Sequence, residues 1–523
     1  MSKQKFPIGI QDFRKLRKEG FVYIDKTRLI HQLVTTGHYY FLSRPRRFGK
    51  SLLVSTIKEL FSGDKALFQG LWIENNWDWN TKLPVIHLKM SQIDYQSNGL
   101  YQGLNQELQR IGTDLGIQLT EQTLKNRFSE LIQKAAQSGP VVILMDEYDK
   151  SIIDNLENPN LAEKNQDILK QFYSILKDAD PHIRLMLVTG VSKFSKVSIF
   201  SDLNNLEDIT ISAPLHDITG ITQEELNRHF SAEIAEIATN NSTSETDLKD
   251  TIRQWYNGYS WGGKDRLYNP FSILSFFKNQ QFNNFWFETG TPSFLVELIR
   301  TAEKFELDKT EYTALLGLSE FDPQNPNFKT VLFQTGYLTI DQINLPEGWC
   351  QLKYPNKEVK DSLEQLLLAA YRYTPSNEAL PIILQLRNAF NNQNIEAVIE
   401  LINASFASIP YPLWQGATEL HYHALVHLTF SLLGTYVQSE VNSSKGRCDA
   451  IVKTDKTIYA LEFKLDESAD IALQQIQDRG YLTPYLHLPV EKIAIGINFS
   501  SKNKNVADWR IGKPYDLREV KHL

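Results

Sequence analysis

Two apolar runs, each followed directly by charged residues, give the first indication of the fold. Residues 39–42 precede a basic loop, and residues 141–145 precede Asp146 and Glu147. Continuous apolar runs with β-branched or aromatic residues are typical of strands buried on both faces. The first run is followed by apolar residues at helical spacing, at Leu53, Ile57, Leu60 and Phe61. This pattern predicts a strand, a loop and a helix in succession.

Three further strands are predicted in the same part of the chain. They lie at residues 84–90, 182–190 and 206–211, and the mixed segment 100–136 reads as mostly helical. Strands that alternate with helices in this way favour a parallel sheet covered by helices.

A helical region is predicted downstream of this sheet. Thr222 and Glu225 have the spacing of a capping box that opens a helical lid. After the turn-rich residues 322–327, we expect a helix and a two-stranded wing within residues 331–354, packed on the core rather than on DNA. The aromatic segment 255–263 suits either the core of the lid or stacking on nucleic-acid bases.

The last part of the chain predicts a small α/β domain. Helices within residues 381–407 and 418–433 precede three strands, at residues 436–441, 447–452 and 458–463. A turn-forming stretch before these helices reads as a hinge. We therefore expect three domains, at residues 1–215, 216–373 and 374–523.

Length and composition agree with an ordinary globular protein of about three domains. The 523 residues are 42 % hydrophobic and 22 % charged. No apolar run approaches the roughly 18 residues that a membrane span requires, and Cys350 and Cys448 are too few for a disulfide framework. We expect a cytoplasmic protein without a membrane partner. The net charge of −7 means that any nucleic-acid partner must be attracted by local basic patches.

The basic loop after the first strand predicts a nucleotide site. It ends in Gly49, Lys50 and Ser51, which suit a loop whose backbone N–H groups wrap phosphates while the lysine reaches the outer phosphates and the serine holds Mg²⁺. The first glycine of the common motif is replaced by Arg44. The alternative is a basic turn with a fortuitous Gly-Lys-Ser.

The acids after the second strand fit the same site. Asp146 suits Mg²⁺ binding, and Glu147 suits activation of the water that attacks the γ-phosphate. The alternative is a solvated acidic turn, which Asp149 next to them would also suit. Thr189 or Ser192, at the polar end of another strand, lies where a γ-phosphate sensor belongs, or else caps a turn.

A second candidate site is predicted in the last domain. Strand alternation directs Glu462 and Lys464 to one face, and Asp449 lies in the preceding strand. Carboxylates with a neighbouring lysine suit Mg²⁺ and an attacking water. Glu440 or Glu419 could add an acid, and Gln475 and Tyr481 follow on the next helix. The alternative is surface carboxylates paired with a lysine.

The chain resembles two known families at these motifs. The loop at residues 44–51, the acidic strand end at 145–149 and the segments 255–259 and 267–272 are similar to the AAA-ATPase-like family, in which the loop begins with arginine instead of glycine. Residues 422–423, 446–449 and 462–464, with Glu440 and Gln475, resemble a PD-(D/E)XK nuclease domain. The resemblance implies an α/β fold: a P-loop NTPase with a parallel sheet and a helical, winged-helix lid, followed by a restriction-endonuclease-like domain.

The resemblance also implies roles for individual residues. ATP would be bound by the segment Arg47, Phe48, Gly49, Lys50, Ser51 and Leu52 together with Asp146 and Thr189, with Ser51 and Asp146 on Mg²⁺ and Glu147 as the base. In the nuclease domain Asp449 and Glu462 would bind metal, Lys464 would lie beside the water, and Glu440 and Gln475 would support them. Arg46 and Arg47 are candidates for an arginine finger only by proximity, and a finger could come from another subunit of a homo-oligomer.

Three functions remain open from the sequence. The first is a bacterial ATP-driven nuclease acting on DNA or RNA. The second is an ATP-controlled switch that binds nucleic acid or protein without cleavage, which the net charge of −7 favours. Against it, residues 492–523 hold seven Lys or Arg and three Asp or Glu, a local basic surplus of four. The third is a scaffold that retains an inactive nuclease fold.

Overall fold

The computed structural model describes residues 4–193, 205–262, 266–286, 295, 312–318, 327–372, 379–407, 438–439 and 449–512. The chain divides into two compact units, one formed by Met1–Phe294 and Leu307–Lys360 and the other by Leu295–Glu306 and Asp361–Leu523. Each unit has its own five-stranded sheet, and the first also has a three-stranded sheet. Within the described ranges, no helix is both long enough and apolar enough to cross a bilayer.

The first unit is built on a parallel sheet with the strand order β2-β3-β4-β1-β5. The sheet confirms the predicted parallel α/β fold. Because parallel strands end at the same edge, the ends of β1, β3 and β4 meet there, with Ser43 paired to Gly190. The strands are β1 (Tyr39–Ser43), β2 (Val85–Lys89), β3 (Val141–Asp146), β4 (Ile183–Gly190) and β5 (Glu207–Asp208).

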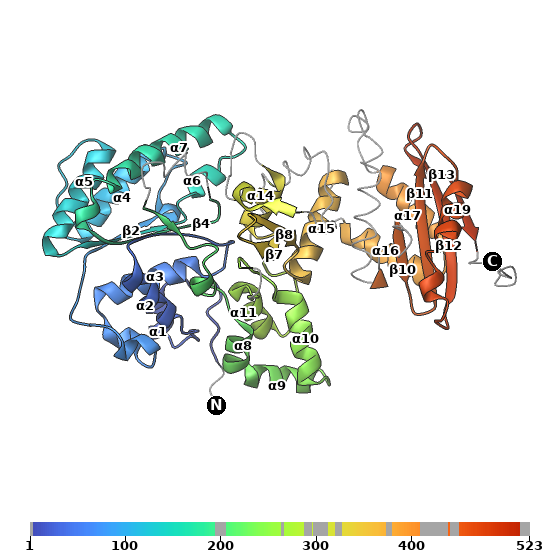
Figure 1. The fold of residues 1–523 in the computed structure, drawn as a ribbon, viewed down its shortest axis with the longest axis horizontal. Coiled ribbons are helices and arrows are strands. Elements are labelled where there is room, and N and C mark those ends of the chain that lie inside the picture. Colours follow the sequence, from blue (N-terminus) through green and yellow to red (C-terminus); the bar gives the residue numbers. More distant parts are fainter. Residues whose placement is uncertain are drawn as a thin grey trace. The chain divides into compact units, whose positions relative to one another are not determined.

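Helices cover both faces of this sheet (Figure 1). The helices α1 to α3 lie on one face, and α4 to α7 lie on the other. Alternate residues of β3 and β4 pack against the helices α1 to α3 in one hydrophobic core. These residues are Val142, Leu144, Leu185 and Leu187, and their side chains have no solvent exposure. The helices are α1 (Phe13–Lys18), α2 (Thr27–Thr36), α3 (Lys50–Ser62), α4 (Leu100–Asp114), α5 (Leu124–Ala135), α6 (Lys150–Ile153) and α7 (Pro159–Tyr173).

Four helices after the sheet form a lid with a core of its own. Thr222 and Glu225 form the predicted capping box, in which each side chain accepts from the other residue's backbone N–H. The aromatic residues Phe230, Tyr256, Phe276 and Phe277 fill the core of the lid. The helices are α8 (Gln223–His229), α9 (Ser231–Asn240), α10 (Glu245–Tyr256) and α11 (Pro270–Asn279).

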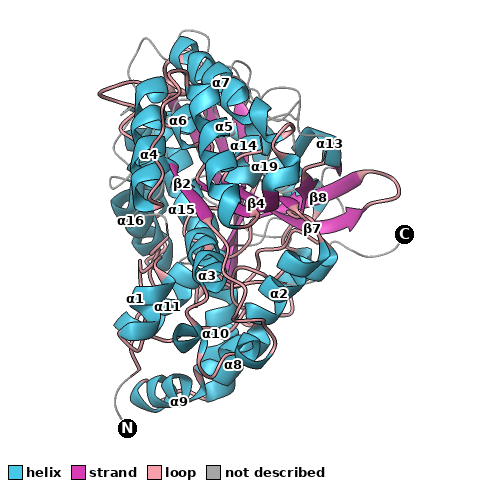
Figure 2. Ribbon diagram, turned by 90° about the vertical axis from the view of Figure 1, so that its left-hand side faces the viewer, coloured by secondary structure: helices cyan, strands magenta, loops and turns pink. Residues whose placement is uncertain are grey.

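The expected two-stranded wing has a third strand. The short β6 (Tyr312–Ala314) pairs with β8 (Trp349–Lys353), which pairs on its other side with β7 (Thr339–Asn344). The sequence analysis missed β6 because its three residues form no apolar run, and only the pairing with β8 defines it. Figure 2 shows the β7–β8 hairpin projecting beyond the neighbouring helices. The helices that flank these strands in the chain are α13 (Leu315–Leu318) and α14 (Phe328–Thr335). Helix α15 (Lys357–Arg372) follows β8 and continues into the second unit.

The second unit contains a mixed sheet with the order β13-β12-β11-β10-β9. The strands β11 and β12 are parallel and are joined through α19, while the other pairs are antiparallel. The elements are α16 (Ala379–Asn391), α17 (Ile395–Ala407), β9 (Gln438–Ser439), β10 (Ala450–Lys453), β11 (Thr457–Leu465), α19 (Ala469–Arg479), β12 (Glu491–Ser500) and β13 (Asn505–Gly512).

Candidate functional site

The basic loop joins the end of β1 to the start of α3. Gly49 precedes the helix with φ +92°, a conformation that glycine adopts without steric cost. The Lys50 ammonium turns back and donates to the carbonyl oxygens of Arg44, at 2.7 Å, and Pro45, at 2.9 Å. Burial lowers the pKa of Lys50 to about 8, against the opposing effect of Asp149, Asp146 and Glu147 nearby. The loop therefore holds a desolvated cation at a helix N-terminus, which favours an anionic ligand.

Arg44, which stands in place of the usual first glycine, turns into the protein interior. Its side chain is fully buried and donates to the carbonyl oxygens of Ser43, Thr210 and His216. The guanidinium carbon lies 4.0 Å from the ring centre of Trp261. Burial lowers the pKa of Arg44 to about 9. Arg44 is thus a structural clamp for the loop rather than a phosphate ligand.

The acids of β3 lie at the same edge of the sheet as this loop. Asp146 is buried and accepts a hydrogen bond of 2.7 Å from the Thr189 hydroxyl, at the end of β4. The Thr189 hydroxyl therefore binds the carboxylate of Asp146, whereas the alternative interpretation was that it caps a turn. Glu147 has φ +57°, a strained backbone conformation of the kind that gathers at functional sites.

Asp149 does not belong to a solvated turn. It is 1 % exposed, and its carboxylate accepts from the backbone N–H groups of Val191 and Ser192. Burial raises its pKa to about 6. The alternative interpretation of an exposed acidic turn therefore fails for this residue.

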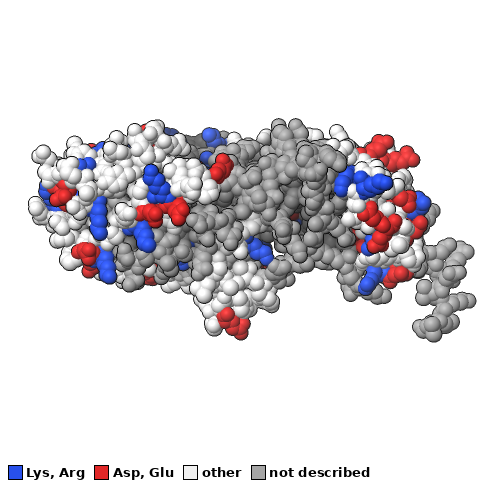
Figure 3. All heavy atoms as spheres, turned by 90° about the horizontal axis from the view of Figure 1, so that it is seen from above, with Lys and Arg blue, Asp and Glu red and all other residues white. Residues whose placement is uncertain are grey.

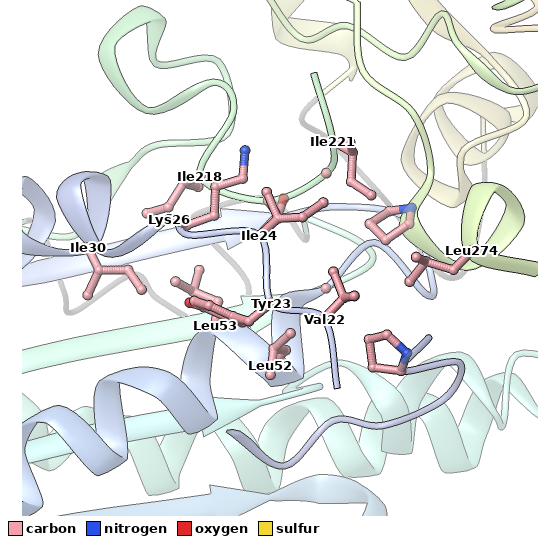
Figure 4. A pocket seen from close by; sticks show the side chains of 15 residues that line it. Val22, Tyr23, Ile24, Lys26, Ile30, Leu52, Leu53, Ile218, Ile221 and Leu274 are labelled. Atoms are coloured by element: carbon pink, nitrogen blue, oxygen red, sulfur yellow. The ribbon is translucent and has the colours of Figure 1, made fainter. Parts of the chain in front are cut away.

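An apolar cavity opens beside the loop (Figure 4). Val22, Tyr23 and Ile24 line it from the N-terminal segment, and Leu52 and Leu53 line it from α3. Its remaining walls come from the segment before α8 and from α11, with Ile218, Ile221 and Leu274. Of these residues the sequence analysis had assigned only Leu52 to the ATP site and had named Leu53 only as an apolar position of the helix. The other segments are far apart in the chain, and none carries a motif of its own.

The lid packs directly on the loop. Phe48 makes edge-on ring contacts with Tyr259 and Trp261, so these aromatics belong to a core instead of stacking on bases. The Arg47 guanidinium carbon lies 4.1 Å from the ring centre of Phe271, on α11. Its pKa is lowered by burial and by Arg46, whose carbonyl oxygen accepts from the Trp286 indole.

The second candidate site lies at the start of β10 and on β11 in the second unit. The Asp449 carboxylate accepts from the backbone N–H of Phe463 at 2.8 Å, and Glu462 accepts from the Gln475 side-chain amide on α19. The Lys464 ammonium lies 3.8 Å from the Glu462 carboxylate. Four predicted side chains thus come together across two strands and a helix.

The electrostatics of this cluster suit a cation. Glu462 is 3 % exposed, and burial followed by the nearby charge of Asp449 raises its pKa to about 7. The negative charges of the two neighbouring carboxylates repel each other, and a bound Mg²⁺ would relieve this repulsion. The Gln475 amide and the Lys464 ammonium lie beside the carboxylates. Asp449 and Glu462 are the residues that would hold it. In the described part of the chain, no three His, Cys, Asp or Glu side chains form a metal-binding group.

Several predicted residues remain apart from these contacts. Glu440 and Glu419 lie outside the described residues. Tyr481 lies near the second site, where its hydroxyl accepts from the Gln475 amide at 3.4 Å. Ser51 is the second residue of α3 and is partly exposed. The Arg46 guanidinium lies 3.7 Å from the carboxylate of Asp154, at the end of α6.

Comparison with known proteins finds one family model that matches part of the first unit and another that matches part of the second unit. Residues 7–200 match the family model of a predicted AAA-ATPase, and residues 417–509 match that of the PD-(D/E)XK nuclease superfamily. The chain belongs to the AAA-ATPase-like family and carries a C-terminal domain of the PD-(D/E)XK nuclease superfamily, which confirms the predicted resemblance.

One similar full-length relative is the "Uncharacterized protein in vnfD 5'region" of Azotobacter chroococcum mcd 1. It is 38 % identical, over 97 % of this chain and 99 % of the relative. Among solved structures, Cdc6p from Pyrobaculum aerophilum is 11 % identical over 65 % of this chain and 90 % of that chain, with a TM-score of 0.22.

Replacing Arg44 is expected to destabilise the first unit. Arg44→Ala removes the donor for two buried carbonyl oxygens and one partly buried one, so the free energy of unfolding should fall by about 2–4 kcal/mol. Urea unfolding followed by tryptophan fluorescence measures this change. Arg28→Ala, at an exposed position on α2, should leave the transition unchanged. Equal stability of the two variants would refute the role of Arg44 as a clamp.

The pKa of Glu462 predicts how stability depends on pH. Because burial raises this pKa from 4.5 to about 7, the folded state holds the proton more tightly than the unfolded state. Its contribution to stability is complete below pH 4.5 and is lost as the pH rises to about 7. At pH 8 without divalent metal, Glu462→Gln should exceed the wild type in stability by on the order of 3 kcal/mol. Thermal unfolding of the wild type and of Glu462→Gln below pH 4.5 and at pH 8 tests whether the difference in stability has the expected sign. Glu467→Gln, at an exposed position, is the control.

Proposed function

We propose that this protein binds and hydrolyses ATP in its first unit and that this turnover controls a Mg²⁺-dependent nuclease in its second unit. The observation that carries the proposal is that each unit brings predicted site residues together at one place. Lys50, Asp146 and Thr189 meet at one sheet edge, and Glu462 meets Lys464 at the other site. The family membership supports the same architecture.

ATP would be held by groups of different character. The loop backbone and the Lys50 ammonium would bind the phosphates, and Ser51 and Asp146 would hold Mg²⁺. The apolar cavity beside Leu52 suits the adenine base, since a flat heterocycle can bury its faces against Ile and Leu side chains. Glu147 would accept the proton of the attacking water, and the Thr189 hydroxyl would fix the orientation of Asp146.

Phosphodiester cleavage would use the cluster of the second unit. Mg²⁺ held by Asp449 and Glu462 would supply positive charge and lower the pKa of a bound water. The Lys464 ammonium would orient that water and offset negative charge that builds up on the phosphate. Gln475 would fix the Glu462 carboxylate through its amide. The substrate class of this reaction is nucleic acid, DNA or RNA.

A second function, an ATP-controlled binding switch without cleavage, is favoured by charge. The net charge is −7, and Figure 3 shows basic and acidic side chains interspersed over the described parts of the face it displays. A phosphate backbone binds most strongly to a surface where basic residues gather. The two functions differ in a single measurable property, which is divalent-metal-dependent cleavage.

Removal of the Lys50 ammonium should abolish ATP turnover. Lys50→Ala removes the cation that is expected to stabilise charge on the outer phosphates, so kcat should fall by on the order of 100-fold or more. A phosphate-release assay at saturating ATP measures the change. Lys58→Ala, on the same helix at a partly exposed position, is the matched control and should retain wild-type turnover. Undiminished hydrolysis in Lys50→Ala would exclude the proposed ATP site.

Loss of a carboxylate in the second unit should abolish cleavage. Glu462→Ala and Asp449→Ala each remove a proposed metal ligand, so cutting of supercoiled plasmid and of single-stranded DNA or RNA should fall to the level without enzyme. The assay is run with Mg²⁺ or Mn²⁺, with and without ATP. Glu467→Ala, an exposed acid five positions further along, should cut like the wild type. Absence of cleavage by the wild type in all conditions would instead support the binding switch.

A further inference from the structure

The backbone just after β4 is held almost entirely by side chains from other elements. This segment, residues 191–193, follows Gly190. The Ser43 hydroxyl, at the end of β1, donates to the carbonyl oxygen of Val191 at 2.5 Å. The Tyr148 hydroxyl, two residues after Asp146, donates to the carbonyl oxygen of Ser192 at 3.1 Å. The two carbonyl groups are thereby tied to the end of β1 and to the residues just after β3.

Two N–H groups of the same segment are bound by Asp149, which lies three residues after the end of β3. The Asp149 carboxylate accepts from Val191 N at 2.9 Å and from Ser192 N at 2.6 Å. Its burial leaves no water to replace these bonds, so the carboxylate fixes the segment strongly. Gly190 adds close packing, because a Cβ there would lie 2.6 Å from the Tyr148 ring.

The third residue of the segment, Lys193, is bound by a glutamine of α14. Gln334 lies on α14 and is 5 % exposed. Its amide oxygen accepts from Lys193 N at 3.2 Å, and its amide nitrogen donates to the carbonyl oxygens of Lys193 and Leu318, at 3.4 and 2.9 Å. The amide thus pairs with both backbone groups of Lys193, which an apolar side chain of the same size could not do.

The segment is continuous with the ATP site. Thr189, two residues before Val191, donates to Asp146, and Gly190 accepts from the backbone N–H of Arg44 in the phosphate loop. A displacement of Lys193 is therefore transmitted along three residues to the side chain that orients Asp146. Because every backbone group of residues 191–193 has a fixed partner, the segment has little freedom to absorb such a displacement.

We propose that residues 191–193 act as a strap that fastens the nucleotide site to α14, and that Gln334 is a positioning residue for ATP hydrolysis. Among the described residues, the side-chain hydrogen bonds of Gln334 go to Lys193 and Leu318, and we infer that it acts through Lys193, the strap and Thr189. The alignment of the hydrolytic groups thus depends on the helix that packs beside the three-stranded sheet. This inference rests on the proposed ATPase function and adds to it a link between hydrolysis and this part of the chain.

The test removes the hydrogen bonds of Gln334 while keeping its volume. Gln334→Met should lower kcat for ATP hydrolysis by on the order of 10-fold, since misplacement of catalytic groups by a fraction of an ångström is costly. The KM for ATP should change little, because no contact with the ligand is lost. Gln342→Met, at an exposed position on β7, is the matched control and should match the wild type. Hydrogen exchange at Lys193 should be faster in Gln334→Met only.

A second variant loosens the strap from its other end. Tyr148→Phe removes the hydroxyl that donates to Ser192 and should also lower kcat more than it changes KM. If both residues position the same segment, the effects will be non-additive, and the double variant will lose less activity than the product of the single losses. Tyr148→Phe also provides the test if Gln334→Met does not fold, which thermal unfolding reports.

Two results overturn the inference, and they differ from failure of the proposed function. A kcat for Gln334→Met equal to that of Gln342→Met, or strictly multiplicative effects in the double variant, refutes the strap while leaving the ATPase intact. A wild-type protein without ATP turnover, or turnover that survives Lys50→Ala, refutes the ATPase itself and with it the strap.

Discussion

The buried guanidinium of Arg44 is the interaction on which the nucleotide side of this protein depends. It joins the end of β1 to the residues after β5, through carbonyl oxygens at Ser43, Thr210 and His216, and it stacks on Trp261 of the lid. A buried cation is costly unless all its partners are in place, so these segments must assemble together. The phosphate loop is thereby shaped by a side chain, where a glycine would shape it by backbone freedom alone.

The two candidate sites use burial in opposite senses. Desolvation lowers the pKa of Lys50 to about 8 and raises that of Glu462 to about 7, so each site weakens the charged form that its ligand would stabilise. A phosphate would compensate the first and a divalent cation the second. Both sites would therefore hold their proposed ligands through charge complementarity in an environment where water screens little, which makes such interactions stronger than at an exposed surface.

Much of each site could be predicted from the sequence, because simple geometric rules bring the residues together. Parallel strands end at one edge of the sheet, which places Lys50 near Asp146 and Thr189, and alternation along β11 places Glu462 and Lys464 on one side. The apolar cavity and the third strand of the wing could not be predicted in this way. Val22 and Ile218 carry no motif and lie in segments far apart in the chain, and they meet only after the fold has formed.

The contact between Gln334 and Lys193 spans 141 residues, and no periodicity encodes it. Its trace in the sequence is a glutamine among the mostly apolar residues 331–338. Because burial of an amide without a partner costs several kcal/mol in an apolar medium, a buried glutamine implies a backbone partner somewhere, although the sequence does not name it. The same reasoning applies to Ser43 and Thr189 at the ends of apolar strands, whose hydroxyls bind Val191 and Asp146. Polar residues that interrupt a buried run therefore indicate where distant segments are fastened together, and only the structure shows which segments these are.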